Sequence, residues 1–361
     1  MININYDIVN VISIDKNNTI SYTYNITTNS YPMKKFYVWV LIILIAGFVL
    51  GMFVFRKFET PQPIARQPLR IGLNPWIGNG LYYIAKEKGF FEKENIEAQL
   101  ENFDDSAIGR QLLETDKIDV LPFTPETVVV LADAGVKIKI IGMSDSSEGA
   151  DGIIASKEIK NISDLKGKKV AFEVGSPSHL FLSYLLDKEG LTTNDLTVIG
   201  SPAPDAGTAF IAGKVDAAVT WEPWLSKASE RTDGHLLVSS KILPIFPDMF
   251  VFREESVKNR AQDIRAMLRA FFAARKWTST NQAEAVSIIA KNFKITDKEV
   301  KDQLPTFRWL SYEDNLAAFN ASQPQDLIQK AGDLWLKLGL IKTKINADDL
   351  IDASLLKDIY Q

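Results

Sequence analysis

The chain has no cysteine and only two histidines, His179 and His235, among its 361 residues. Without cysteine it can form no disulfide bond, thiolate nucleophile or cysteine-ligated zinc site, and it lacks the residue through which bacterial lipoproteins carry their lipid. No nucleophile elbow, phosphate-binding loop or paired-histidine motif occurs either. We therefore expect no cofactor, no metal site, no catalytic residue and no enzymatic activity.

A basic excess is also missing, since 41 Lys and Arg residues stand against 45 Asp and Glu residues, for a net charge of -4. Such a balance does not suit a phosphate backbone, so nucleic acid is excluded as a partner. The hydrophobic fraction of 46% and the charged fraction of 24% are those of a globular protein long enough for two cores.

One long apolar run is present near the start of the chain. Residues 36–55 form twenty consecutive positions without a charge, which as a helix would span about 30 Å, the thickness of a bilayer core. We expect an N-terminal membrane anchor or signal segment over residues 33–57. Phe53, Val54 and Phe55 run directly into Arg56 without a small-residue cleavage site, which favours an uncleaved anchor over a signal peptide.

The segments on either side of this run differ from it in composition. Residues 1–32 are rich in Asn, Ile, Tyr and Thr and end just before Met33, which resembles a natural translation start. We expect residues 1–32 either to be disordered or to result from a mis-assigned start codon upstream of the natural start at Met33. Residues 58–68 include the proline-rich run Thr60 to Pro68 and are expected to be a linker.

From Leu69 onward, short β-branched runs alternate with amphipathic stretches, as in α/β units built on mainly parallel sheets. The expected strands are Leu69–Asn74, Ile96–Asn102, Ile118–Leu121, Lys137–Met143, Gly152–Ala155, Lys169–Glu173, Leu196–Ile199, Val215–Thr220 and Met249–Arg253. The expected helices include Tyr82–Lys88, Ala107–Thr115, Ser178–Lys188, Gly207–Ala212 and a long stretch from Ser256 to Ser279. The last hundred residues are predicted to be almost wholly helical.

Four segments carry a resemblance to a known family. They are LNPWIGNGLYYIAKEKGFFEKENIEAQL, LPFTPETVVVLADAGVKIKII, GADGIIASKEIKNISDLKGKKVAFEVGSPSHLFL and AFIAGKVDAAVTWEPWLSKA. Together, in this order and spacing, they resemble the substrate-binding proteins of nitrate, sulfonate and taurine ABC importers, within the wider superfamily of thiamine-pyrimidine binding proteins. The resemblance covers about residues 68 to 300.

The resemblance implies a type II periplasmic-binding fold, in which two α/β lobes joined by two crossover hinge strands close on a ligand. Lobe I would be discontinuous, over residues 69–148 and 245–361, and lobe II would cover residues 149–244. With the N-terminal transmembrane helix before it, the expected fold class is a two-lobe α/β protein on a membrane tether.

The candidate ligand residues follow strands, because ligands of open α/β sheets bind beyond the carboxyl ends of the strands. Ser176 and Ser178 open an expected helix, where hydroxyls, backbone N–H groups and the helix dipole could bind an anion. The same residues would serve equally well as a plain helix cap with proline in the first turn. His179 could donate to the ligand there or help to cap the helix.

Tryptophans mark two further loops. Trp221 and Glu222 offer an indole face beside a carboxylate, which suits an amine or a flat ligand. The alternative is that Glu222 and Trp224 pack the next helix, which begins at Pro223. Trp76 lies in the first strand-helix loop, where the resemblance implies ligand contact.

Three weaker candidates complete the expected site. Asn79 and Thr124 are as consistent with turn chemistry as with ligand binding. Asp151 stands at the expected crossover, where it could contact the ligand or serve the hinge.

The leading functional hypothesis is an extracytoplasmic solute-binding protein for an ABC importer, with a taurine- or alkanesulfonate-like anion or zwitterion as ligand. Its partners would be the permease and ATPase subunits and the cytoplasmic membrane, reached through residues 36–55, and we expect a monomer. A neutral pyrimidine stacked between Trp76 and Trp221 is an alternative, as is a ligand sensor. The fungal pyrimidine-precursor synthase of this fold uses iron, histidine and cysteine, a catalytic set that this chain cannot assemble.

Overall fold

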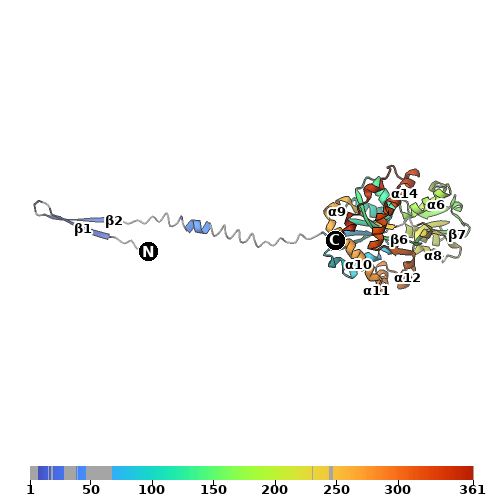
Figure 1. Ribbon diagram of the computed structural model, residues 1–361, viewed down its shortest axis with the longest axis horizontal. Helices are drawn as coiled ribbons and strands as arrows, with labels where there is room; N and C mark the ends of the chain where they lie inside the picture. Colours follow the sequence, from blue (N-terminus) through green and yellow to red (C-terminus); the bar gives the residue numbers. More distant parts are fainter. Residues whose placement is uncertain are drawn as a thin grey trace. The chain divides into compact units, whose positions relative to one another are not determined.

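The computed structural model describes residues 7–14, 16–17, 19–27, 38, 40–45, 67–229, 231–243 and 247–360. The chain divides into two compact units, Met1–Ala65 and Arg66–Gln361 (Figure 1). Each unit is described by itself.

The first unit contains an antiparallel hairpin of β1 (Asp7–Ile14) and β2 (Ile20–Thr27), in register from Asp7 opposite Thr27 to Ile14 opposite Ile20. Alternating Ile, Val, Tyr and Thr residues explain the strands, since β-branched and aromatic side chains favour extended backbone. We had expected a disordered tail or an untranslated segment here and did not predict the hairpin. A translation start at Met33 stays a prediction.

The apolar run at 36–55 lies mostly outside the described residues. Of this run the structure describes Val38 and residues 40–45, which are helical and exposed. Among the described residues no helix is both long and apolar enough to cross a bilayer. The expected N-terminal transmembrane helix is therefore not supported by the structure.

The second unit contains two mixed sheets. The first has the order β13-β6-β12-β5-β3-β4, in which β3 is parallel to β4 and β5 while β12 and β13 are antiparallel to their neighbours. Its strands are β3 (Leu69–Leu73), β4 (Ala98–Asn102), β5 (Val120–Phe123), β6 (Ile138–Ser147), β12 (Pro247–Arg253) and β13 (Phe307–Trp309). β5 is completely buried, as its unbroken apolar sequence predicts.

The second sheet has the order β11-β7-β10-β8-β9, with β8 parallel to β9 and β10, and β7 antiparallel to β10 and β11. Its strands are β7 (Asp151–Ser156), β8 (Lys169–Phe172), β9 (Thr197–Gly200), β10 (Ala217–Trp221) and β11 (Gly234–Ser239). The nine strands expected after Leu69 are thus all present, with ends shifted by a few residues. β11 and the three-residue β13 were not predicted.

The chain crosses between the sheets twice, from β6 to β7 and from β11 to β12. The expected lobe boundaries, at residues 149 and 245, fall in these connections. Gly149 in the first crossing has φ of 129°, a backbone conformation that side chains with a Cβ rarely adopt. The movement of the two sheets as separate lobes stays a prediction.

Helices cover both sheets. They are α2 (Gly80–Glu87), α3 (Phe90–Lys93), α4 (Ser106–Glu114), α5 (Pro125–Asp133), α6 (Pro177–Lys188), α7 (Ala203–Ile211), α8 (Trp224–Ser229), α9 (Glu254–Asn259), α10 (Ala261–Thr278), α11 (Gln282–Phe293), α12 (Asp297–Gln303), α13 (Tyr312–Asn320), α14 (Gln323–Lys337) and α15 (Ser354–Lys357). Short 3-10 turns include η1 (Ile77–Asn79), η4 (Ser240–Ile242) and η5 (Leu304–Thr306). In Figure 1, β7, α6 and α8 lie to the right of β6, and α9 and α10 lie to its left.

The helical stretch expected from Ser256 to Ser279 breaks at Arg260, which separates α9 from α10. The guanidinium of Arg260 donates to the carboxylate of buried Asp119 at 3.0 Å and to the carbonyl oxygen of Pro68 at 3.1 Å. These bonds hold the residue out of helical geometry, and periodicity alone could not reveal them.

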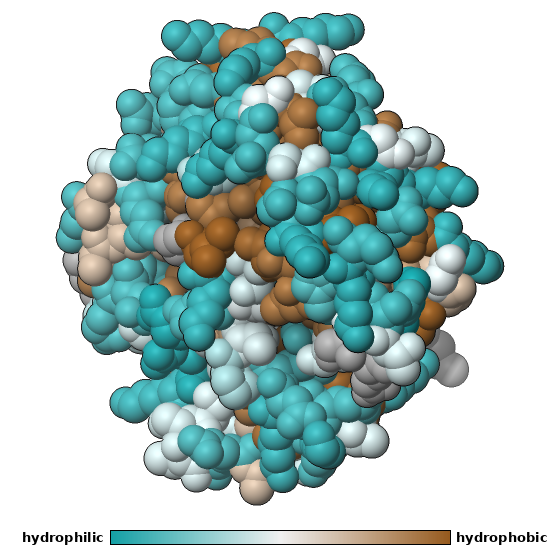
Figure 2. All heavy atoms as spheres, turned by 90° about the vertical axis from the view of Figure 1, so that its right-hand side faces the viewer, coloured by the Kyte–Doolittle hydropathy of each residue, from teal (hydrophilic) through white to brown (hydrophobic). Residues whose placement is uncertain are grey.

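Buried hydrophobic residues form one large cluster that reaches both sheets and a smaller one that packs α7 and α8 on the second sheet. Polar side chains cover most of the face seen from the β7 end, with hydrophobic residues in patches between them (Figure 2). This distribution is that of a body folded around its own core.

Candidate functional site

A small cavity lies between the two sheets. Its volume is about 20 Å³, which is room for about one water molecule. The residues that line it are Asn74, Trp76, Phe123, Thr124, Ser147, Asp151, Pro177, Trp221 and Asp248. The cavity is therefore nearly filled by its own walls, and a ligand larger than water can enter only if these walls move.

The topology explains why these residues meet. Asn74 follows β3, Thr124 follows β5 and Trp221 ends β10, so each stands at the carboxyl end of a strand that has a parallel neighbour. Asp151 begins β7 and Asp248 lies near the start of β12, directly after the two crossings. Larger hollows of about 520 and 410 Å³ lie against α11 and η5 and between α6 and α14, and neither is lined by any residue of the cavity.

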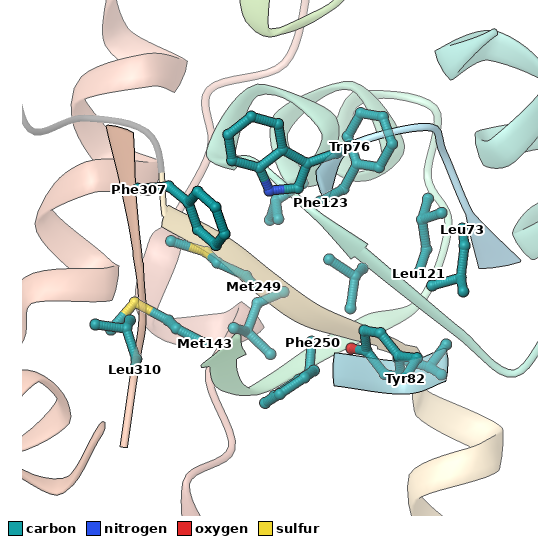
Figure 3. Packing of buried hydrophobic residues seen from close by; sticks show 14 of the residues in the cluster. Leu73, Trp76, Tyr82, Leu121, Phe123, Met143, Met249, Phe250, Phe307 and Leu310 are labelled. Carbon is teal, nitrogen blue, oxygen red and sulfur yellow. The ribbon is translucent and has the colours of Figure 1, made fainter. Parts of the chain in front are cut away.

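Aromatic side chains form much of the wall. The Trp76 indole donates from Nε1 to the Asp145 carboxylate at 2.9 Å and packs edge-on against Phe307, with ring centroids 5.4 Å apart. Figure 3 shows Trp76 between Phe307 and Phe123. Trp221 is 4% exposed, and its Nε1–H has no hydrogen-bond partner among the described residues. A buried indole donor without a partner is costly, so an acceptor on a ligand would complete it.

Three aspartates gather at the cavity. Burial raises the pKa of Asp145 to about 7; the charge of Asp151 adds to this, and hydrogen bonds from Trp76 and Ser144 oppose it. Burial, together with the charge of Glu222, raises the pKa of Asp151 to about 6. Burial and three neighbouring carboxylates raise the pKa of Asp248 well above its usual range. The three pKa values are raised because burial disfavours the charged form and no cation among the residues that line the cavity compensates it.

Asp248 is the lining residue whose carboxylate most clearly lacks a hydrogen-bond donor among the described residues. Its side chain is 7% exposed and lines the cavity, and no residue in the described part of the chain donates a hydrogen bond to its carboxylate. Glu126, fully buried behind it, accepts from Thr124 at 2.7 Å and Thr127 at 3.0 Å, and burial raises its pKa to about 7.

Basic groups are absent from the described residues that line the cavity. Arg110, the cation whose charge reaches Glu126, donates to the backbone oxygen of Gly175 at 2.8 Å. Burial lowers the pKa of His179 to about 4, so this imidazole is neutral at physiological pH. The electrostatics of the cavity are therefore those of a site for a positive group.

The structure brings four of the eight predicted residues to the cavity, namely Trp76, Thr124, Asp151 and Trp221. Asn79 is fully buried outside its lining and donates to the Asn74 carbonyl at 3.1 Å and side chain at 2.8 Å. That position corresponds to the turn chemistry which we had weighed against ligand binding.

The other three predicted residues also lie outside the lining. Ser176 donates its hydroxyl to the Glu173 carbonyl at 2.7 Å, whereas the Ser178 hydroxyl is buried without a partner among the described residues. Glu222 accepts from the backbone N–H of Ser226 at 3.1 Å and from its hydroxyl at 2.8 Å. It thereby caps α8, which agrees with our alternative that Glu222 serves the next helix, although α8 begins at Trp224 and not at Pro223.

Five lining residues, and Asp145 behind Trp76, escaped prediction. Asp145 lies inside the long strand β6, and Asp248 precedes the apolar run of β12, so neither has the loop context that we searched. Asn74, Phe123 and Pro177 lie within two positions of residues that we did select, and Ser147 lies four positions before Asp151. A lone Asp within a buried apolar strand was the available signal, because such a charge needs a partner.

The two crossings are joined by one hydroxyl. Ser240 Oγ accepts the backbone N–H groups of Gly149 at 2.9 Å and Asp151 at 3.3 Å, and it lies 2.8 Å from Ser147 Oγ. Ser240 is buried at the start of η4, in the return crossing. This contact links the hinge segments directly to a cavity residue.

Comparison with known proteins identifies the family. A model of the NMT1-like family matches residues 62–292, which is more than half of the chain. The chain belongs to the NMT1-like family. The resemblance that the four sequence segments carry is thereby confirmed.

Relatives of this NMT1-like protein include a Bacillus subtilis (strain 168) protein named "Putative aliphatic sulfonates-binding protein", 29% identical over 80% of this chain and 87% of the relative. The crystal structure of the periplasmic aliphatic sulphonate binding protein SsuA from Escherichia coli superposes with a TM-score of 0.66 at 23% identity, over 81% of this chain and 100% of SsuA. The periplasmic nitrate-binding protein NrtA from Synechocystis superposes with a TM-score of 0.67 at 16% identity, over 81% and 88%.

These likenesses establish the two-sheet periplasmic-binding fold for this NMT1-like chain. The three relatives are binding proteins by name and not enzymes, which agrees with the expectation that this chain is a binding protein without catalytic activity. Among the described residues, no three acidic, histidine or cysteine side chains are grouped so that they could hold a metal ion.

Proposed function

We propose that this protein is the extracytoplasmic solute-binding component of an ABC importer, which captures a small solute between two lobes and presents it to the permease and ATPase subunits. The observation that carries the proposal is the closed cavity whose walls come from both sheets. A site divided in this way forms when two lobes close about their crossings. The names of the sulfonate- and nitrate-binding relatives support the same role.

For the ligand, the cavity favours a small zwitterion of the taurine type over a simple anion. Asp151 and Asp248 would receive an ammonium group, while the unpartnered Nε1–H of Trp221 would donate to an acceptor at the other end. The relative named for aliphatic sulfonates supports a sulfonate as that acceptor. The anion site expected at Ser176 has less support, because its hydroxyl is bonded to Glu173.

The proposed location is the periplasm or cell exterior, with residues 36–55 as anchor in the cytoplasmic membrane. The support is the length of the uncharged run in the sequence. A tethered monomer would keep its lobes at high effective concentration near the permease. The lobes would comprise residues 69–148 with 245–361 and residues 149–244.

A second candidate ligand is a neutral pyrimidine or similar flat heterocycle. Two indoles, Trp76 and Trp221, line the cavity and could stack on its faces. Ring nitrogens would accept from Trp221, and an exocyclic amine would donate to Asp248. Binding of such a ligand would depend little on ionic strength, whereas that of a charged ligand would change with added salt.

Lobe closure can be tested with the full-length chain in detergent. Because the sequence contains no cysteine, the exposed residues Asp205 and Lys298 can be exchanged for cysteine and spin-labelled without background. We expect taurine or a thiamine-type pyrimidine to shift the distribution of distances between the labels and to raise the melting temperature. A ligand that raises the melting temperature of the protein but leaves these distances unchanged would contradict the closure mechanism.

A further inference from the structure

We infer that the cavity selects its ligand through a protonated amine or quaternary ammonium group, and that simple anions such as nitrate and methanesulfonate do not bind there. The inference rests on the proposed function and specifies its ligand class. It differs from the sequence analysis, which predicted an anion site at the loop that contains Ser176.

The first argument is the sign of the charges around the cavity. Asp151 and Asp248 line it, and Asp145 lies directly behind Trp76, to which it is bonded. Above the pH range in which Asp151 and Asp145 titrate, an anion brought to this position would meet like charges in a largely buried region. A cation would stabilise the ionised form of these carboxyl groups, whose pKa values are raised first by burial and then by neighbouring carboxylates.

The second argument comes from polar groups without partners. The carboxylate of Asp248 receives no hydrogen bond from the described residues, although its side chain is more than nine-tenths buried. The Nε1–H of Trp221, another lining residue, is buried and has no hydrogen-bond partner among the described residues. One ligand that carries both a cationic donor and an acceptor would satisfy both groups at once.

The third argument is the chemistry of the walls. Indole faces attract cations, and Trp76, Trp221 and Phe123 surround the carboxylates. Metal ions prefer several oxygen or nitrogen ligands at short distance, and no such group exists among the described residues. The aromatic walls therefore favour an organic cation over a metal ion.

Binding of this kind releases protons. A cation stabilises the ionised carboxylates, so the affinity rises with pH through the range in which they titrate, about pH 6 to 7 for Asp151 and Asp145. The titratable and charged groups that face Asp248 and its neighbours are Asp145 on β6, Asp151 on β7, Glu126 on α5, Glu222 after β10, Tyr82 on α2 and, through Glu126, Arg110 on α4.

Isothermal titration of the full-length chain tests the charge selectivity with four probes: taurine, trimethylammonium, methanesulfonate and nitrate. We expect heat of binding with taurine, trimethylammonium or both, and none with the two anions. Below the pKa of the titrating carboxyl, the affinity should fall about tenfold for each pH unit. Buffers of different ionisation enthalpy should reveal protons released on binding.

Two matched variants separate the site from a general charge effect. Asp248→Asn keeps the shape of the side chain but removes its charge, and should weaken binding of the ammonium probes at least tenfold at pH 8. Asp205→Asn removes one exposed charge on α7 and should leave the affinity unchanged. Circular dichroism and melting temperature confirm that both variants fold.

The outcomes distinguish this inference from the proposed function. Binding of methanesulfonate or nitrate as tight as that of taurine, unaffected by Asp248→Asn, would overturn the charge selectivity and leave the solute-binding role standing. Affinity for ammonium probes that is the same at pH 5.5 and 8 would also overturn it. If no ammonium probe binds, the inference is wrong; if the anions and a thiamine-type pyrimidine fail as well, the proposed function falls with it.

Discussion

The buried charge of Asp145 makes a quantitative prediction about stability. The pKa of this carboxyl is about 7 in the folded chain, against an ordinary value of 3.8. Between these values the folded state binds more protons than the unfolded state, so the unfolding free energy falls as the pH rises. Each pH unit corresponds to about 1.4 kcal/mol, which makes the full effect of Asp145 on the order of 4 kcal/mol.

Asp145→Asn isolates this effect, because the amide oxygen can still accept the Trp76 indole N–H while the charge is gone. Relative to the wild type, the variant should gain roughly 3 kcal/mol of unfolding free energy between pH 5 and pH 8, since about two pH units of that interval lie below the pKa. The carboxyls of Asp248 and Asp151 titrate together with Asp145, so the gain belongs to the group as a whole.

The measurement is urea unfolding of both proteins at pH 5, 6, 7 and 8, with Asp205→Asn as a control for the change in net charge. The control should parallel the wild type at every pH, because Asp205 is exposed. The opposing result is a difference in unfolding free energy between Asp145→Asn and the wild type that is the same at pH 8 as at pH 5. In that case the charge of Asp145 is compensated in the folded chain, and the reasoning on the acidic cavity fails.

Three further substitutions test the structure. Ser240→Ala removes the acceptor of the Gly149 N–H and should lower the unfolding free energy by about 1–3 kcal/mol in urea titrations, so an unchanged midpoint would argue against the joined crossings. Glu222→Gln should leave ligand affinity within about twofold by calorimetry, because its carboxylate faces α8 and not the cavity; a large loss would restore it as a ligand contact. Arg260→Ala should cost roughly 2 kcal/mol, since it removes a charged hydrogen bond to buried Asp119, and a thermal melt equal to the wild type would contradict this.

Much of the fold was predictable because its strands are short apolar runs between turn residues. Leu69–Leu73 and Lys169–Phe172 match their predicted starts, since a buried parallel strand leaves a clear signal in the sequence. β11 is half-exposed and β13 has three residues, so neither leaves such a signal. We missed the hairpin in residues 7–27 because we took the Asn-, Ile-, Tyr- and Thr-rich composition of residues 1–32 as that of a disordered tail or an untranslated segment.

The site residues could be predicted only where they lie at or directly after the end of a strand. Trp76 and Trp221 were found because tryptophan in such a loop is unusual, whereas Asp145 and Asp248 lie within strands and become neighbours only through the pairing of β6 with β12. Hydroxyl groups were the least reliable guide. Ser176 and Thr124 both have local partners, and a sequence does not show which serines turn back to the backbone.

The hydroxyl of Ser240 has a mechanical consequence. Because it bonds to the outgoing crossing from within the returning one, neither segment can bend alone without losing hydrogen bonds that are buried from water. The two crossings should therefore turn together about one shared axis, which restricts the lobes to a single opening path. A permease that receives solute from this protein would then always meet the same pair of surfaces at the same angle.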